Sequence, residues 1–251
     1  MSNFIDLTNK NILVTGATSG IGYEACVQIV KYGGNLIAIG RDENKLNELK
    51  KLTKNTSVIV IKYDLEDLEN LDNLITQIPF SVDGIVHSAG IVQLQPVKFL
   101  DIKTINKIRT INYDSIVLII SKLLKKKMIN KNSSIVFISS IAADFGMKGN
   151  LIYSSTKAAL NSSAKVFASE LSLQKIRVNT IAPGQVETPL TLEIASTVSE
   201  EAINIDKQKY PLGYGKPEDI ANLILFLISD KSSWITGTTI TIDGGRSNIL
   251  N

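Results

Sequence analysis

The feature of this chain that most constrains its fold is an alternation of short β-branched runs with longer stretches of helical periodicity. Most of the short runs are continuous apolar segments, which is typical of parallel strands buried on both faces. The seven runs lie at Asn11–Thr15, Asn35–Ile39, Ser57–Ile61, Gly84–His87, Ser133–Ser139, Arg177–Ile181 and Thr238–Ile242. We therefore expect one parallel sheet of about seven strands.

Helical periodicity fills the intervals between these strands. The expected helices are Gly20–Tyr32, Asp42–Leu52, Leu65–Gln77, Ile102–Lys127, Leu151–Leu173 and Pro217–Ser229. The last of them opens with proline followed by Glu-Asp, a favourable helix start. Because crossovers between parallel strands are right-handed, the helices must cover both faces of the sheet. The sequence thus predicts an α/β fold with a doubly wound parallel sheet.

The length of 251 residues fits one large domain or two small ones. No linker rich in Pro, Gly or Ser and no break in composition divides the chain, so we predict a single domain over residues 1–251. The weakly patterned segment Pro189–Tyr214 follows the carboxyl end of a predicted strand, where open α/β sheets bind their ligands. We expect it to be a substrate lid, with an ordinary surface excursion as the alternative.

Composition excludes several classes of function. The formal charge of +3 is small and the lysines are scattered, so no nucleic-acid partner is indicated. The only cysteine is Cys26 and the only histidine is His87, which argues against a disulfide or an ordinary His/Cys metal site. The N-terminus lacks a signal-peptide pattern and no apolar run reaches about 18 residues. We expect a cytoplasmic protein without a membrane partner.

A glycine-rich turn follows the first predicted strand and leads into the first predicted helix. It reads Thr15-Gly16-Ala17-Thr18-Ser19-Gly20-Ile21-Gly22. Glycine permits the tight turn, the approach of a pyrophosphate to backbone amides at a helix N-terminus, and close packing of helix on strand. In this strand–turn–helix context we predict a dinucleotide site formed by Gly16, Thr18, Ser19, Gly20, Ile21 and Gly22. A purely structural turn is the alternative.

The end of the second predicted strand indicates which dinucleotide is bound. An acidic residue there would bond the ribose 2′-OH and repel a 2′-phosphate. The strand instead ends at Gly40 and is followed by Arg41, whose guanidinium suits a phosphate. NADP(H) is therefore favoured. NAD(H) stays possible for two reasons. The adjacent Asp42 could pair with Arg41, and the residue before Gly20 is Ser19 rather than a second basic residue.

Further motifs extend along the chain: TGATSGIG, Asn112, Ser140, Tyr153-Ser-Ser-Thr-Lys157 and Pro183-Gly184. This combination resembles the short-chain dehydrogenase/reductase family, in its compact branch, over essentially the whole chain. The resemblance implies a single Rossmann-type domain and reversible hydride transfer between NAD(P)(H) and a carbonyl or alcohol. It also implies a catalytic tetrad of Asn112, Ser140, Tyr153 and Lys157.

Helix geometry explains the central pair of this tetrad, because residues four apart lie on one face. We expect the Lys157 ammonium, together with an oxidised nicotinamide, to lower the Tyr153 pKa. Tyr153 would be the general acid in reduction and the general base in oxidation. By resemblance, Lys157 also holds the nicotinamide ribose, Ser140 bonds the substrate oxygen, and Asn112 positions a water that links Lys157 to solvent.

The resemblance implies additional cofactor contacts. They are Asp64, Leu65, Ser88, Ala89, Gly90, Pro183, Gly184, Val186 and Thr188. Asp64 is expected beside the adenine, while Val186 and Thr188 would face the carboxamide. His87-Ser88 replaces the two asparagines usual in the family, so the bond that steadies the central sheet should come from Ser88 or be absent. We expect His87 to be structural rather than catalytic.

The best-supported function is NADP(H)-dependent reduction of a 3-oxoacyl thioester, whose acyl group could be carried on acyl-carrier protein. A sugar, steroid or polyol dehydrogenase of the same family is the alternative, and a non-catalytic dinucleotide sensor is a third hypothesis. The segments Leu94–Phe99 and Pro189–Tyr214 would distinguish the substrates but carry no readable pattern. The ending Ile240–Gly245 resembles a strand and turn that pack in a tetramer interface, so a homotetramer is expected by resemblance.

Overall fold

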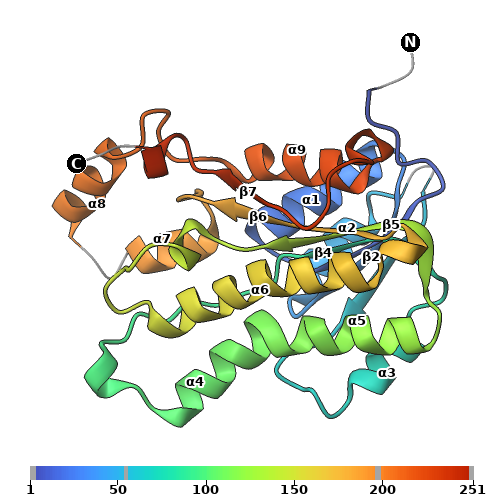
Figure 1. Cartoon of the computed structure of the whole chain (residues 1–251), viewed down its shortest axis with the longest axis horizontal. Helices are drawn as coiled ribbons and strands as arrows, with labels where there is room; N and C mark the ends of the chain where they lie inside the picture. Colours follow the sequence, from blue (N-terminus) through green and yellow to red (C-terminus); the bar gives the residue numbers. More distant parts are fainter. Residues whose placement is uncertain (1–3, 54–55, 196–198, 249–251) are drawn as a thin grey trace.

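The computed structural model describes residues 4–53, 56–195 and 199–248, and contains one seven-stranded parallel sheet (Figure 1). The strands are β1 Asn11–Thr15, β2 Asn35–Gly40, β3 Val58–Lys62, β4 Val82–His87, β5 Ile129–Ile138, β6 Arg177–Pro183 and β7 Thr239–Ile242. Their order across the sheet is β3-β2-β1-β4-β5-β6-β7, and every pair is parallel. The doubly wound fold predicted from the sequence is confirmed.

Alternate side chains of the central strands enter two separate apolar cores, one on each face of the sheet. In β1, Leu13 belongs to one core, whereas Ile12 and Val14 belong to the other. In β5, Phe137 and Val136 divide in the same way. All five side chains are fully buried, which explains why these strands read as continuous apolar runs rather than as alternating patterns.

Helices cover both cores (Figure 1). One face carries α1 Gly20–Lys31, α2 Glu43–Lys50 and α9 Pro217–Ile228. The other carries α3 Leu71–Thr76, α5 Ser115–Lys125 and α6 Leu151–Glu170, with α4 Ile102–Arg109 leading into α5. Within the described residues, no helix is both long and apolar enough to cross a membrane.

The predicted elements differ most from the observed ones in three places. Helix α3 begins at Leu71 instead of Leu65, because Asp64 and Asp67 accept backbone N–H bonds from Glu66 and Asn70 and so hold the preceding residues in turns. Strand β5 begins at Ile129, and its pairing with β4 shifts register between Val82 and Gly84. The long helix predicted over residues 102–127 is interrupted by a π-helical turn, Thr110–Asp114.

The segment predicted to be a lid contains two helices, α7 Pro189–Ala195 and α8 Glu200–Gln208, which its weak pattern did not indicate. Figure 1 shows them together at the end of the molecule where the carboxyl end of β6 leads toward α7. A parallel bridge between Val186 and Gly215 closes the base of the segment. Residues 196–198 of the predicted lid lie outside the described residues.

Candidate active site

The glycine-rich turn is shaped by contacts that admit no side chain. Gly16 has φ +70°, and a Cβ on it would lie 2.5 Å from the Ala89 backbone nitrogen. A Cβ on Gly22 would lie 2.2 Å from the Gly16 carbonyl oxygen. Ser19 precedes α1 in an extended conformation and makes no side-chain cap. The N–H groups of the first turn of this helix are therefore free to receive an anion at the positive end of the helix dipole.

A hollow runs from this turn to the ends of β2 and β3. It is lined by Gly16, Thr18, Ser19, Ile39, Gly40, Arg41, Tyr63, Asp64, Leu65, Ser88, Ala89, Gly90, Ile91 and Ile111. A Cβ on Gly40 would lie 2.4 Å from Thr18 Cγ2, so the end of β2 has no room for an acidic side chain without a shift of Thr18. The hollow combines apolar walls, a helix N-terminus and one guanidinium, which are the groups needed to hold adenosine and phosphates.

The guanidinium of Arg41 has a partner other than the one that the sequence suggested. Arg41 Nη1 lies 3.7 Å from Asp64 Oδ2. Asp42, expected as the alternative partner, instead caps α2 by accepting a hydrogen bond from the Lys45 backbone N–H at 3.1 Å. Both Arg41 and Asp64 remain largely exposed, so their pair is weak and leaves Arg41 able to meet a phosphate.

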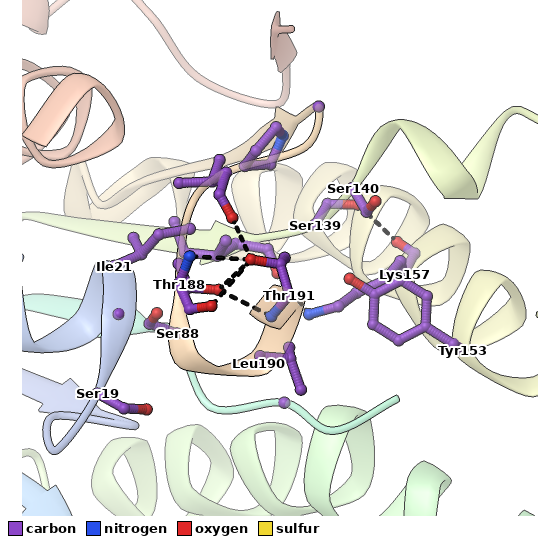
Figure 2. Close-up of a pocket in the computed structure, with 16 residues that line it drawn as sticks. Ser19, Ile21, Ser88, Ser139, Ser140, Tyr153, Lys157, Thr188, Leu190 and Thr191 are labelled. Atoms are coloured by element: carbon purple, nitrogen blue, oxygen red, sulfur yellow. Dashed lines mark hydrogen bonds between the residues drawn. The ribbon is translucent and has the colours of Figure 1, made fainter. Parts of the chain in front are cut away.

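A second hollow adjoins the first and shares Ser19, Ser88 and Gly90 with it. Figure 2 shows Tyr153 and Lys157 projecting from α6 into this hollow, with Ser140 beside them. Lys157 Nζ lies 5.5 Å from the centre of the Tyr153 ring. The two predicted residues therefore meet as the four-residue spacing requires.

Burial controls the charge state of both groups. The Lys157 Nζ is buried and donates to the Ile138 carbonyl oxygen at 2.8 Å, and burial lowers its pKa to about 8. Burial raises the pKa of Tyr153, and hydrogen bonding with Ser140 opposes this rise only in part. The expectation that Lys157 and an oxidised nicotinamide together lower the Tyr153 pKa stays a prediction, because this rise comes from the protein groups alone. They favour the neutral phenol, which is the form that can donate a proton.

Asn112 lies in the π-helical turn, behind the hollow rather than on its wall. Its side chain is fully engaged: Oδ1 accepts from the Ile91 N–H at 2.8 Å, and Nδ2 donates to the Ile91 carbonyl at 2.9 Å and to Thr156 Oγ1 at 3.2 Å. A Cβ on Gly90 would lie 3.6 Å from Asn112 Oδ1 and 3.2 Å from Lys157 Nζ. The π-bulge therefore fixes the loop after β4 against the lysine.

His87 is fully buried and links the sheet to this bulge. Its Nε2–H donates to the Asn112 carbonyl oxygen at 3.1 Å, so Nδ1 accepts from the Thr15 hydroxyl at 2.7 Å. Burial lowers its pKa to about 3. The side-chain bond that steadies the central sheet was expected from Ser88, but His87 provides it, while Ser88 contributes a backbone bond to the Thr15 carbonyl. The arrangement supports a structural role for His87.

The turn after β6 closes the second hollow. Its four predicted residues, Pro183, Gly184, Val186 and Thr188, all line the wall. A Cβ on Gly20 would lie 3.0 Å from Thr188 Cγ2, so the loop after β6 reaches the first turn of α1. Thr191 Oγ1 donates to the Val186 carbonyl at 2.7 Å and accepts from the Thr188 N–H at 2.9 Å. Sequence reasoning missed Thr191, although its spacing from Thr188 is typical of a helix start.

A third cavity, of about 400 Å³, opens on the other side of Tyr153 and Ser140. Most of its wall is apolar, with Val92, Leu94, Ile141, Ala142, Phe145, Met147 and Leu190 among the lining residues. Its polar lining includes Asn150, Asp206, Tyr210 and Arg246, none of which the sequence analysis singled out. Its size suits a small organic molecule, and its position places such a molecule against the Tyr153 hydroxyl.

The described residues fit a dinucleotide and offer nothing for a metal. The first two hollows bring all the predicted cofactor residues except Gly22 to their walls, and Gly22 packs behind the phosphate turn. No group of three or more His, Cys, Asp or Glu residues that could hold a metal ion occurs in the part of the chain that the structure describes.

Known proteins resemble this chain over almost its whole length. A family model described as "Enoyl-(Acyl carrier protein) reductase" matches residues 16–247. A 3-oxoacyl-(acyl-carrier-protein) reductase of Rickettsia felis is 36% identical over 242 residues, covering 96% of this chain and 98% of the relative. An L-xylulose reductase of Caenorhabditis elegans is 32% identical over 247 residues, covering 97% and 98%.

Solved structures are similar as well. The structure of 4-hydroxyisoleucine dehydrogenase complexed with NADH matches with a TM-score of 0.86 and 30% identity, over 96% of this chain and all of that one. A glucose/ribitol dehydrogenase from Brucella melitensis matches with a TM-score of 0.86 and 29% identity, over 98% and 99%. The similarity in sequence and in fold therefore extends through the three hollows.

Proposed function

The chain belongs to the short-chain dehydrogenase/reductase family of NAD(P)-dependent oxidoreductases, and we propose that it reduces the 3-oxo group of an acyl thioester with NADPH. The observation that carries the proposal is the convergence of Tyr153, Lys157 and Ser140 at the junction of the dinucleotide hollows and the apolar cavity. The similarity to 3-oxoacyl reductases along the whole chain supports the choice of substrate.

The groups at the junction suit the protonation of a developing alkoxide. A bound dihydronicotinamide supplies the hydride to the carbonyl carbon. The neutral phenol of Tyr153 donates its proton to the carbonyl oxygen, and the Ser140 hydroxyl hydrogen-bonds the same oxygen. The nearby Lys157 ammonium stabilises the phenolate that this transfer leaves. Oxidation of the alcohol reverses these roles.

The preference for NADP(H) is part of the proposal. Arg41 would bind the 2′-phosphate, and the N–H groups at the start of α1 would bind the pyrophosphate. The crowded position of Gly40 supports this, because it leaves no place for an acidic residue that would repel the phosphate. Val186 and Thr188 would face the carboxamide. NAD(H) is the alternative, and the related dehydrogenase solved with NADH makes it a necessary comparison.

A second candidate is the oxidation or reduction of a sugar or polyol. The polar residues Asn150, Asp206 and Tyr210 in the third cavity favour it, as do the L-xylulose reductase and glucose/ribitol dehydrogenase similarities. Segment 189–214 would serve as the lid over either substrate. A protein that only senses dinucleotides has no use for the Tyr153–Lys157 pair, which argues against that hypothesis.

We also propose a homotetramer in the cytoplasm. The proposal rests on the resemblance of the ending Ile240–Gly245, which holds most of β7 and the glycine turn after it, to a strand and turn that pack in a tetramer interface. Sedimentation of the purified protein tests the assembly, for which a monomer is the contrary result.

The proposed reaction is tested by NADPH oxidation with an acetoacetyl thioester, a panel of other ketones, and polyols with NADP⁺ or NAD⁺. We expect the thioester to be reduced and Tyr153→Phe to lower kcat by roughly 100- to 10,000-fold, with nucleotide binding unchanged. Tyr113→Phe is the matched control, because the Tyr113 hydroxyl bonds Ser163 away from the hollows. Full activity of Tyr153→Phe, or turnover of polyols alone, would contradict the proposal.

A further inference from the structure

The wall of the third cavity carries a cation, Arg246, that the proposed reaction itself does not use. Its wall contains Val92, Leu94, Phe145, Met147 and Leu190, whereas Arg246 is the one lysine or arginine among its lining residues. A cation beside an apolar wall is a means of orienting an amphipathic substrate. Arg246 therefore bears on which chemical class of substrate the cavity binds.

Packing of the C-terminal turn determines where this guanidinium lies. The turn before Arg246 needs Gly244 and Gly245, which have φ of +59° and +87°. A Cβ on Gly245 would lie 3.2 Å from Pro211 Cγ, so the turn rests on the end of the predicted lid segment. Arg246 Cζ then lies 5.9 Å from the centre of the Tyr210 ring. This cation–π contact holds the guanidinium over a partly buried aromatic wall.

The nearby carboxylates are committed to other donors. Asp243 accepts from the Gly245 N–H at 3.0 Å and from the Ser247 N–H at 2.7 Å. Asp206, the other charged residue of the cavity wall, accepts from the Tyr214 hydroxyl at 3.0 Å. Arg246 forms no ion pair within residues 4–53, 56–195 and 199–248. Its N–H donors can therefore serve a ligand, and they match the geometry of a carboxylate or phosphate.

A second polar group in the same wall independently indicates a ligand. Asn150 is only 6% exposed, and its Oδ1 is buried without a hydrogen-bond partner among the described residues. The contact of its Nδ2 is a weak one, to Met147 Sδ at 3.9 Å. A buried amide oxygen without a donor is costly and uncommon in folded proteins. This oxygen is closed off from solvent in the structure, so a donor group on a ligand in the cavity would remove this cost once the Asn150 amide turns toward the cavity.

We propose that the substrate of this site carries a negatively charged group, a carboxylate or a phosphate, that Arg246 receives while the Asn150 amide, turned toward the cavity, accepts a hydrogen bond from the same molecule. The inference rests on the proposed function, because it places the ketone of that substrate at Tyr153. A free oxo acid offers the carboxylate, and a phosphopantetheine thioester offers both a phosphate and amide N–H groups. A neutral sugar or steroid lacks the anion.

Pairs of ketones that differ only in charge test the inference. One arm compares oxo acids, with one to six methylenes between ketone and carboxylate, with their methyl esters. The other compares acetoacetyl-phosphopantetheine with acetoacetyl-pantetheine, so the arms distinguish carboxylate from phosphate. We expect the wild type to prefer the anionic member in at least one arm. Arg246→Ala should lower kcat/KM for that member roughly 10- to 100-fold and leave its neutral partner within about 2-fold.

The matched control is Lys148→Ala, which removes a positive charge from an exposed residue adjoining Met147 without removing a residue of the cavity wall. It should change either substrate by less than about 2-fold. Equal losses for the anionic and neutral members in Arg246→Ala, or no preference in the wild type, would overturn the inference.

A binding measurement separates this inference from the proposed reaction. The oxo acids and acetoacetyl-phosphopantetheine are titrated by calorimetry into protein saturated with NADP⁺. Binding that Arg246→Ala weakens roughly 10-fold or more, in a protein that reduces no ketone, would refute the proposed reaction and support the anion site. Reduction of neutral ketones, with no binding of any anionic member, would leave the reaction standing and refute the anion site.

Discussion

The preference for NADP(H) depends on a competition that the structure allows us to weigh. Arg41 and Asp64 are 61% and 47% exposed, and their closest charged atoms are 3.7 Å apart. An exposed pair of this kind contributes about 0–1 kcal/mol. Charge-assisted hydrogen bonds from the guanidinium to a 2′-phosphate contribute about 1.5–3 kcal/mol. The phosphate should therefore displace Asp64 and retain roughly 0.5–3 kcal/mol of net binding free energy.

Arg41→Ala should then raise the Kd for NADPH roughly 2- to 160-fold and change the Kd for NADH by less than about 2-fold. Asp64→Asn removes the competitor and should lower the Kd for NADPH by up to about 5-fold. Both constants are measured by fluorescence titration at fixed ionic strength, because the contact is exposed and salt screens it.

Lys45→Ala serves as the control, since its ammonium pairs with Glu48 at 2.8 Å and does not line the hollow. Equal weakening of NADPH and NADH by Arg41→Ala would refute the assignment of the 2′-phosphate to this residue. Tighter binding of NADH than of NADPH by the wild type would refute the preference itself.

Three further predictions follow from other parts of the site. Gly22→Ala places a Cβ 2.2 Å from the Gly16 carbonyl oxygen, so chemical denaturation should show that the free energy of unfolding falls by about 1–3 kcal/mol, and nucleotide binding should weaken. Gly146→Ala is the control, because its Cβ would meet nothing within 4 Å, and it should change the free energy of unfolding by less than about 0.5 kcal/mol. Because the His87 pKa is about 3 in the folded protein and 6.5 ordinarily, the unfolded chain takes up a proton that the folded one does not, and stability falls as the pH falls below 6.5. Urea unfolding at pH 7 and pH 5 should show this as an extra loss of about 2 kcal/mol that His87→Asn lacks, and equal losses would contradict it. Because the Lys157 pKa is about 8, the ammonium loses its proton as the pH rises, and kcat/KM for reduction should decline above pH 8. Arginine keeps its charge in this range, so a decline with the same midpoint in Lys157→Arg would show that another group is responsible.

Several features of the fold and site follow from patterns within a few residues of each other. The run Ile12–Val14 is apolar at every position because both faces of β1 are covered, so the parallel sheet could be predicted. Tyr153 and Lys157 meet because helix geometry places residues four apart together. The glycines of the phosphate turn could be identified because a strand that turns tightly into a helix leaves no room for a side chain at these positions.

Other features depend on residues that are distant in the chain. Nothing near His87 predicts that its ring joins Thr15 to the Asn112 carbonyl, because that bridge needs the sheet order and the π-bulge together. Burial of Tyr153 likewise raises its pKa, a shift that the spacing from Lys157 does not predict. Helix α8 lacks any buried residue, so burial in the core does not dictate its sequence.

The sequence by itself determined the sheet, the dinucleotide turn and the Tyr153–Lys157 pair, because each is set by local backbone geometry and by burial of neighbouring side chains. Only the tertiary structure decided that Arg41 pairs with Asp64 rather than Asp42, and that Arg246 lines the third cavity beside Tyr210. These contacts join segments that are far apart in sequence. Their partners are selected by how the loops pack at the carboxyl edge of the sheet, and periodicity along the chain contains no information about that packing.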